Sequence, residues 1–160
     1  MRSDLRIAII SLIAAFALAI LPMPDWALKF RPDWVTLAMI YWAMALPSRI
    51  GVTSAFFAGL MLDVAHGAIL GQHAVGLVIV VYIVLLQHQR LRVASLLQQA
   101  LVVLALLLWK QLLVMWVNGI AGYPTGGWQV FLPSLVGAVL WPWVYIILRD
   151  LRRKFVYRKM

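Results

Sequence analysis

Long apolar runs alternate with short polar breaks along most of the chain. Prolines, glycines and clusters of charged residues form the breaks. Runs of this kind predict transmembrane helices, because a helix satisfies its own backbone hydrogen bonds in lipid. We predict an all-α polytopic membrane protein, with one transmembrane domain over residues 1–160 and six transmembrane helices, at about 7–21, 34–46, 50–65, 75–86, 96–117 and 130–148.

Three of the six segments are short for a bilayer. A transmembrane helix needs about 20 apolar residues, and the second, third and fourth segments fall below this length. Less polar flanks, or a tilted and thinner arrangement, would make up the difference. The alternative is five transmembrane helices, with one of the short segments re-entrant.

Composition agrees with a membrane protein. Hydrophobic residues make up 65% of the chain and charged residues only 12%, whereas soluble proteins carry about 25% charged residues. A net charge of +9 would suggest nucleic-acid binding in a soluble protein. Here the cations stand at the ends of the apolar segments, so we expect membrane lipid and no nucleic acid as a partner.

The Lys and Arg residues also predict an orientation. If the N-terminus lies inside, the outer side receives only Lys29 and Arg31, Lys110 lies within a segment, and the other eleven cations fall on the inner side. The positive-inside rule therefore places both termini in the cytoplasm. A basic cytoplasmic tail over 149–160, suited to the anionic inner leaflet, contains Arg149, Arg152, Arg153, Lys154, Arg158 and Lys159.

The first segment also resembles a secretory signal peptide. Arg2 and Arg6 precede an apolar run, and Ala17-Leu18-Ala19 resembles a cleavage site. Cleavage there would leave a new N-terminus inside the apolar stretch Ile20-Leu21-Pro22. We therefore expect the segment to be retained as the first helix.

Small residues recur every fourth position through the third segment. On a helix, a step of four advances about 40° beyond a full turn, so neighbouring members share a face that another helix backbone can approach closely. The plain interpretation is ordinary helix packing, and the functional one is a face for a partner helix. We expect the last member of the set in the turn after the helix. The set is Gly51, Ala55, Gly59, Asp63, Gly67 and Gly71.

Two ionisable residues fall within the apolar segments. A carboxylate such as Asp63 is costly in a membrane and marks a functional hypothesis. Lys110 falls at a comparable depth in the fifth segment, so an Asp63–Lys110 ion pair is geometrically open. Alternatively, Lys110 snorkels to the outer surface and Asp63 caps a turn. Gln111 and Asn118 extend a polar stripe beside Lys110, which would line a cavity, bind a partner helix or bond a neighbouring backbone.

The sequence offers little catalytic chemistry. Cys and Glu are absent, which excludes disulfides and thiolate metal sites. His66 and His73 flank the turn near Asp63, but two histidines and one carboxylate are a weak metal signal. We find no nucleophile with a neighbouring base and no phosphate-binding loop. We therefore predict no metal, no cofactor and no enzymatic activity.

Several short motifs resemble the rod shape-determining MreD family over essentially the whole chain. The run from Asp63 through Gly67 to Gly71 is the most specific. The motifs are Arg31-Pro32-Asp33-Trp34, Gly59-Leu60-Met61-Leu62-Asp63-Val64, Leu70-Gly71-Gln72-His73-Ala74 and His88-Gln89-Arg90.

The resemblance implies a non-catalytic inner-membrane component of the cell-elongation machinery of a rod-shaped Gram-negative bacterium. It implies direct binding to MreC and, in the same complex, association with MreB, RodA and the transpeptidase partner of RodA. It also implies a fold similar to the membrane S-subunits of energy-coupling-factor transporters. From the residues alone, a small-molecule or lipid-binding transport subunit is the alternative, because Asp63, Lys110 and Gln111 lie at one depth.

Overall fold

The computed structural model describes residues 2–157, and side chains over residues 3–155. Within this range the chain is all-helical and contains no strand, which confirms the all-α part of the predicted fold class. The elements are α1 (Arg2–Ile20), α2 (Asp25–Leu28), α3 (Trp34–Ala45), α4 (Val52–His66), α5 (Gln72–Val93), α6 (Leu96–Ile120), the 3-10 helix η1 (Trp128–Phe131) and α7 (Leu132–Tyr157).

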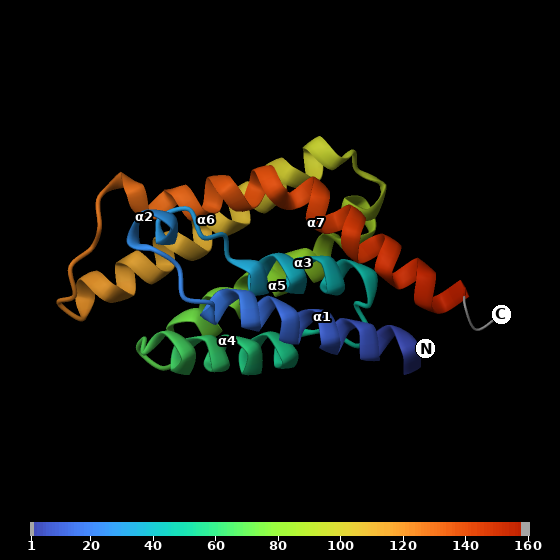
Figure 1. Ribbon diagram of the computed structural model, residues 1–160, viewed down its shortest axis with the longest axis horizontal. Helices are drawn as coiled ribbons and strands as arrows, with labels where there is room; N and C mark the ends of the chain where they lie inside the picture. Colours follow the sequence, from blue (N-terminus) through green and yellow to red (C-terminus); the bar gives the residue numbers. More distant parts are fainter. Residues whose placement is uncertain (1, 158–160) are drawn as a thin grey trace.

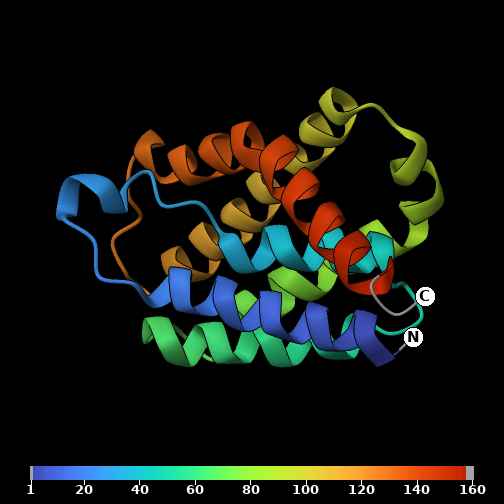
Figure 2. The ribbon, with the colours of Figure 1, turned by 45° about the vertical axis from the view of Figure 1, so that its right-hand side comes forward.

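The longer helices alternate in direction along the chain, so both chain ends lie at the same end of the molecule (Figure 1). We call this the terminal end. Helices α1 and α4 lie side by side along one edge, and α6 and α7 lie together along the opposite edge (Figures 1 and 2). The short α2 stands outside the bundle, in the connection between α1 and α3.

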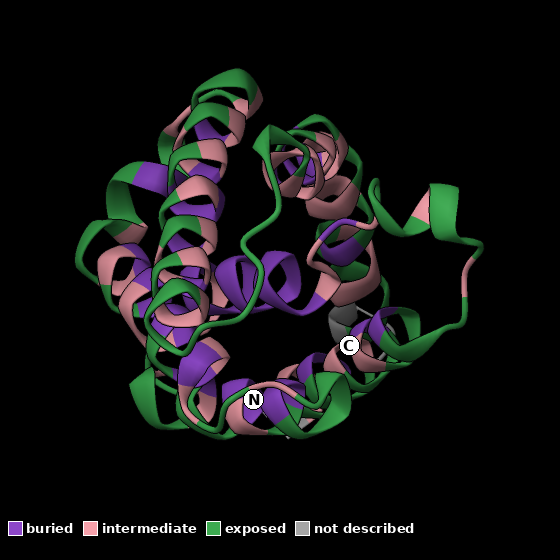
Figure 3. Ribbon diagram, turned by 90° about the vertical axis from the view of Figure 1, so that its left-hand side faces the viewer, coloured by how far each residue is buried: buried purple, intermediate pink, exposed green. Residues whose placement is uncertain are grey.

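Helix α3 forms the centre of the bundle. It packs against α1, α5 and α7, and its residues from Val35 to Met44 are all buried. Viewed along the long axis, buried positions gather toward the inside and exposed ones on the outer faces (Figure 3). A helix that is apolar all round fits a protein interior or a lipid bilayer equally well. Contacts with α1, α5 and α7, and not apolar character alone, place α3 at the centre.

Each predicted apolar segment coincides with a helix, and four of these helices, α1, α5, α6 and α7, extend beyond the predicted bounds by several residues. Helix α5 covers 22 residues, so the fourth segment, predicted at 75–86, is not short. Helix α7 continues through Tyr157, which corrects the predicted helix end at 148. The reason is that Leu, Arg and Lys are good helix formers and nothing between 149 and 157 breaks the helix.

The predicted basic tail is therefore largely helical. Arg149, Arg152, Arg153 and Lys154 belong to the last turns of α7. Arg158 and Lys159 lie outside the described residues.

Within residues 2–157, four helical stretches are long and apolar enough to cross a membrane. They are Ser3–Ile20, Gln72–Val93, Leu96–Ile120 and Trp128–Phe155. Helices α3 and α4 are also apolar but have only 12 and 15 residues. At about 1.5 Å per residue they are shorter than the roughly 30 Å hydrocarbon layer. The shortness predicted for the second and third segments is confirmed.

Candidate functional site

Asp63 lies at the tight turn between α4 and α5. Helix α4 is capped at its C-terminus by Gly67, with φ 61°, and α5 begins after Gly71, with φ 97°. Both values are left-handed, a conformation that glycine adopts without steric cost. The turn folds the start of α5 back against α4. It thereby brings several backbone N–H groups to the Asp63 side chain, which is fully buried.

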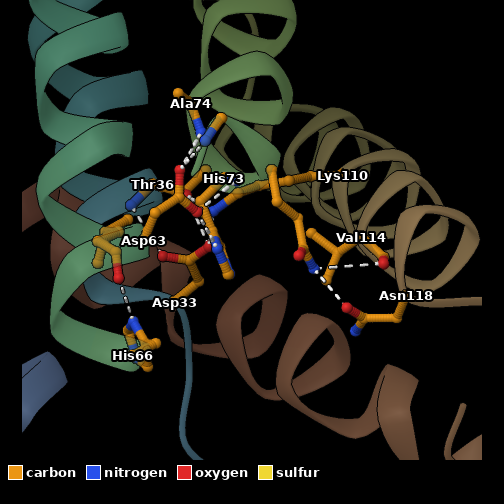
Figure 4. Close-up of polar contacts among 12 residues, drawn as sticks. Asp33, Thr36, Asp63, His66, His73, Ala74, Lys110, Val114 and Asn118 are labelled. Carbon is orange, nitrogen blue, oxygen red and sulfur yellow. Dashed lines mark hydrogen bonds and ion pairs between the residues drawn. The ribbon is translucent and has the colours of Figure 1, made fainter. Parts of the chain in front are cut away.

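The carboxylate of Asp63 accepts hydrogen bonds from the first turn of α5 (Figure 4). The backbone N–H of Gly71 donates to Oδ2 at 2.9 Å, and that of His73 donates to Oδ1 at 2.8 Å. The ring Nδ1 of His73 lies 2.8 Å from Oδ1. The first N–H groups of a helix have no partner within the helix, and its N-terminus favours negative charge. Asp63 therefore ties α5 to α4.

A second polar contact joins α3 to α6. Asp33 is the N-cap of α3, where its Oδ1 accepts from the Thr36 N–H at 3.1 Å. The Thr36 hydroxyl donates to Asp33 Oδ2 at 2.6 Å. Lys110 Nζ, from α6, contacts Asp33 Oδ2 and donates to Thr36 Oγ1 at 2.7 Å. Lys110 is only 3% exposed. We call Asp33, Thr36, Asp63, His73 and Lys110 the polar cluster.

The possible Asp63–Lys110 ion pair does not form. Lys110 pairs with Asp33 instead, and Asp63 caps the start of α5, as one of the sequence alternatives held. The physical reason is local competition: the turn after α4 places several N–H donors next to Asp63. Asp33 precedes an apolar segment in sequence, and only the fold brings it to the depth of Lys110.

Two members of the set of small residues spaced by four, which we call the ladder, hold α4 against α5 of the same chain. A Cβ atom at Gly59 would lie 2.2 Å from Ala74 Cα and 2.7 Å from Ala74 N, so the two backbones touch there. Ala55, one turn earlier, is fully buried. The proposed face for a partner helix is therefore already covered by α5 at Gly59.

Three members of the ladder lie outside this face. Gly51 is the N-cap of α4, with open space where a Cβ would point, and Gly67 and Gly71 form the turn. This corrects the expectation that Gly67 shares the packing face of Gly59 and Asp63. The reason is that α4 already ends at His66. Gly71 lies in the turn, as expected.

The polar stripe on α6 contacts α5. Gln72 Nε2 donates to Asn118 Oδ1 at 3.1 Å and to the Val114 carbonyl at 3.3 Å. Gly76 gives Lys110 room, since a Cβ there would lie 2.9 Å from Lys110 Cγ. Gln72 was named in the sequence only as part of a family motif, and Gly76 was not singled out. Their signal is weak, because one Gln and one Gly near a helix start are common.

Gln111 lines a small cavity beside the polar cluster. The cavity has a volume of about 40 Å³, which is room for a few water molecules at most. The ring of His73 also faces it, with Nδ1 engaged by Asp63. The full lining comprises Asp33, His73, Leu107, Lys110, Gln111, Val114, Pro133 and Ser134.

Near the terminal end, two further polar residues hold helices together. Arg92 caps the C-terminus of α3, donating to the carbonyls of Met44 at 2.6 Å and Ala45 at 2.9 Å. Buried Gln99 donates to the Leu91 carbonyl at 2.8 Å and accepts from Trp141 Nε1 at 3.2 Å. In the sequence, Arg92 entered only as one of the cations on the inner side, and Gln99 was not singled out.

The two histidines near Asp63 stack on each other. The ring centroids of His66 and His73 lie 5.6 Å apart, and His66 Nδ1 contacts the Leu62 carbonyl at 2.9 Å. Over the part of the chain that the structure describes, no three His, Cys, Asp or Glu residues form a group that could hold a metal ion.

Comparison with known proteins decides the family. The model of the rod shape-determining protein MreD family matches residues 1–151. The chain belongs to the MreD family. A rod shape-determining protein MreD from Haemophilus influenzae is 32% identical over 142 residues, covering 89% of this chain and 88% of that protein. No solved structure matches.

Membership of the MreD family places the chain in the rod-shape system of bacteria. Together with its apolar helices, it identifies a multi-pass membrane protein. The MreD match contains the whole polar cluster and both ends of α3, and it stops within the last turns of α7.

Proposed function

We propose that the protein is a non-catalytic scaffold of the cell-elongation complex in the bacterial inner membrane. It binds MreC directly and helps to organise lateral peptidoglycan synthesis, in one complex with MreB, RodA and the transpeptidase partner of RodA. The observation that carries this proposal is the MreD family match over residues 1–151.

The proposal includes six membrane crossings with both termini in the cytoplasm. Its support is the alternating direction of the longer helices, which leaves both chain ends at one end of the bundle. Exposed cations from three connections or helix ends gather there, at Arg6, Arg49 and Arg90. We also propose that the fold is similar to that of the six-helix membrane S-subunits of energy-coupling-factor transporters. Helices α3 and α4 then cross where the bilayer is locally thinned.

The geometry of the polar cluster favours a scaffold over a transport subunit. The transport alternative relied on Asp63, Lys110 and Gln111 to line a pocket. Asp63 and Lys110 are instead engaged in contacts between helices. The cavity that Lys110 and Gln111 do line has about 40 Å³, whereas small-molecule sites have about 300 Å³ or more.

Depletion of the protein in its host tests the proposed role. Cells that lose the protein should become round, and expression of the wild-type chain should restore rods. Rod shape that persists after depletion would contradict the proposal.

Copurification distinguishes the scaffold from the transport alternative. The detergent-solubilised chain should retain MreC and carry no stoichiometric small molecule. A bound vitamin-sized ligand in the absence of MreC would favour the transport subunit.

A further inference from the structure

Five polar side chains line the small cavity of about 40 Å³ beside the polar cluster. They come from the start of α3, from α5, from two successive positions of α6 and from the first turn of α7. A small apolar cavity stays dry, whereas a cavity that offers two to four polar partners holds water. The polar members of the lining are Asp33, His73, Lys110, Gln111 and Ser134.

Two of these side chains already bind each other. Lys110 Nζ contacts Asp33 Oδ2 and donates to Thr36 Oγ1, and both carboxylate oxygens of Asp33 accept from Thr36. The two charges on the lining are opposite and compensate each other, so the cavity has no net charge with which to hold an ion. The side chains left to bind a guest are neutral, which favours a neutral polar molecule.

Ser134 supplies a buried hydroxyl on α7. The residue is only 4% exposed, and within the described residues its hydroxyl makes no hydrogen bond to another protein group. A Cβ atom at Gly137, about one turn later, would lie 2.9 Å from Cδ1 of Leu107, which also lines the cavity. Helix α7 therefore packs closely on α6 here, and the Ser134 hydroxyl needs a partner within the cavity, because a buried hydroxyl without one is costly.

The His73 ring supplies an acceptor. Its Nδ1 lies 2.8 Å from Asp63 Oδ1. An ionised carboxylate only accepts hydrogen bonds, so Nδ1 carries the proton of the neutral ring and Nε2 is left as an acceptor. No described group donates to Nε2. The amide of Gln111 adds both a donor and an acceptor to the same cavity.

We propose that a water molecule binds in this cavity and joins α7 to α5 and α6. It donates to His73 Nε2 and accepts from the Ser134 hydroxyl, and the Gln111 amide is its third partner, which is the usual number for buried water. The contacts of α7 with other helices through Trp141 and Arg152 lie closer to the terminal end. The water is thus the polar connection of the other half of α7. The inference goes beyond the proposed function and does not depend on it.

Solid-state NMR of the full-length chain in phosphatidylcholine bilayers tests this site. Histidine and tryptophan are labelled with ¹⁵N, and magnetisation is transferred from water protons to the side-chain nitrogens at short mixing times. His73 Nε2 should resonate as an unprotonated, hydrogen-bonded nitrogen and should receive magnetisation from water. Trp141 Nε1, which is fully buried and donates to Gln99, should receive none.

Ser134→Val assigns the water signal to the cavity, because the valine side chain is larger and offers no hydrogen bond. Transfer to His73 Nε2 should fall to the level of Trp141 Nε1. The ring of His66 is the internal reference, since it is exposed and stacks on His73, and its transfer should not change. Wild-type transfer to His73 as low as that to Trp141, or undiminished transfer in Ser134→Val, would overturn the proposal.

Ser134→Ala leaves room for the water but removes one of its partners. The folding equilibrium constant, measured by SDS titration in mixed micelles, should fall about fivefold, as for the loss of one water-mediated hydrogen bond. Ser48→Ala is the matched control, because Ser48 is exposed in the connection between α3 and α4, and it should leave the constant unchanged. Equal constants for the two variants would overturn the proposal, even if Ser134→Val does not fold.

Discussion

Asp63 and Asp33 are two carboxylates at the ends of short apolar helices, and they are satisfied in opposite ways. Asp63 accepts hydrogen bonds from residues 8–11 positions later in the chain, so it closes a local turn. Asp33 binds Lys110, 77 positions away, and so joins α3 to α6 across the bundle. Asp63 is fully buried, whereas the side chain of Asp33 remains 29% exposed.

The same type of residue can therefore stabilise a helical bundle through partners close in the sequence or through a partner far away in it. The Asp63 contact fixes one antiparallel helix pair, α4 and α5, whose backbones touch at Gly59. The Asp33 contact positions the central helix α3, which Arg92 also caps at its other end. Four substitution experiments test this distinction.

The largest effect is expected for Asp63→Ala. It leaves the Gly71 and His73 N–H groups and the His73 ring without their acceptor, and each buried donor left unpaired costs about 1–3 kcal/mol. We expect a loss of about 3 kcal/mol or more in the free energy of unfolding, measured by SDS titration in mixed micelles. An unchanged unfolding midpoint would show that water replaces the carboxylate.

Gly59→Ala should come next. The added Cβ would meet the Ala74 backbone at 2.2 Å, and overpacking of this kind typically costs about 1–3 kcal/mol. Gly51→Ala is the matched control, since nothing lies within 4 Å of its Cβ position. If both variants unfold at the same SDS fraction, α4 and α5 are not in backbone contact.

Lys110→Met should lower the free energy of unfolding by less than Asp63→Ala does, by about 2 kcal/mol. It keeps the stem that packs against Gly76 but leaves Asp33 without its cation, and breaking a fully buried pair costs about 3–5 kcal/mol. The loss is smaller here because Asp33 is partly exposed and keeps its bonds to Thr36. A loss as large as that of Asp63→Ala would contradict the distinction between the two sites.

The smallest effect is the coupling energy between substitutions. Lys110→Met and Asp33→Asn together should cost about 1 kcal/mol less than the sum of the single losses, because contacting residues couple. Lys110→Met and Asp63→Asn should be additive within about 0.5 kcal/mol. Coupling of Lys110 to Asp63 but not to Asp33 would reinstate the ion pair that the structure does not form.

The sequence predicted the helices better than their contacts. All apolar segments became helices because lipid leaves the backbone few alternatives. The importance of Asp63 was also predictable, since a carboxylate in an apolar run is costly. The partner of Lys110 could not be predicted, because the fold of all the residues between 33 and 110 determines which side chains come into contact. The extension of α7 was not predicted, because hydropathy indicates only the apolar part of a helix. The helix itself continues into the charged residues that follow.

Our central claim is that the polar cluster holds helices together and performs no chemistry or transport. The most direct test is the cell shape of depleted cells that express the Asp33→Asn, Lys110→Met double variant at wild-type membrane levels. We expect rods, because a folded scaffold does not need the charges themselves. Round cells that contain normal amounts of folded variant protein would contradict it and assign the charged groups a role in activity.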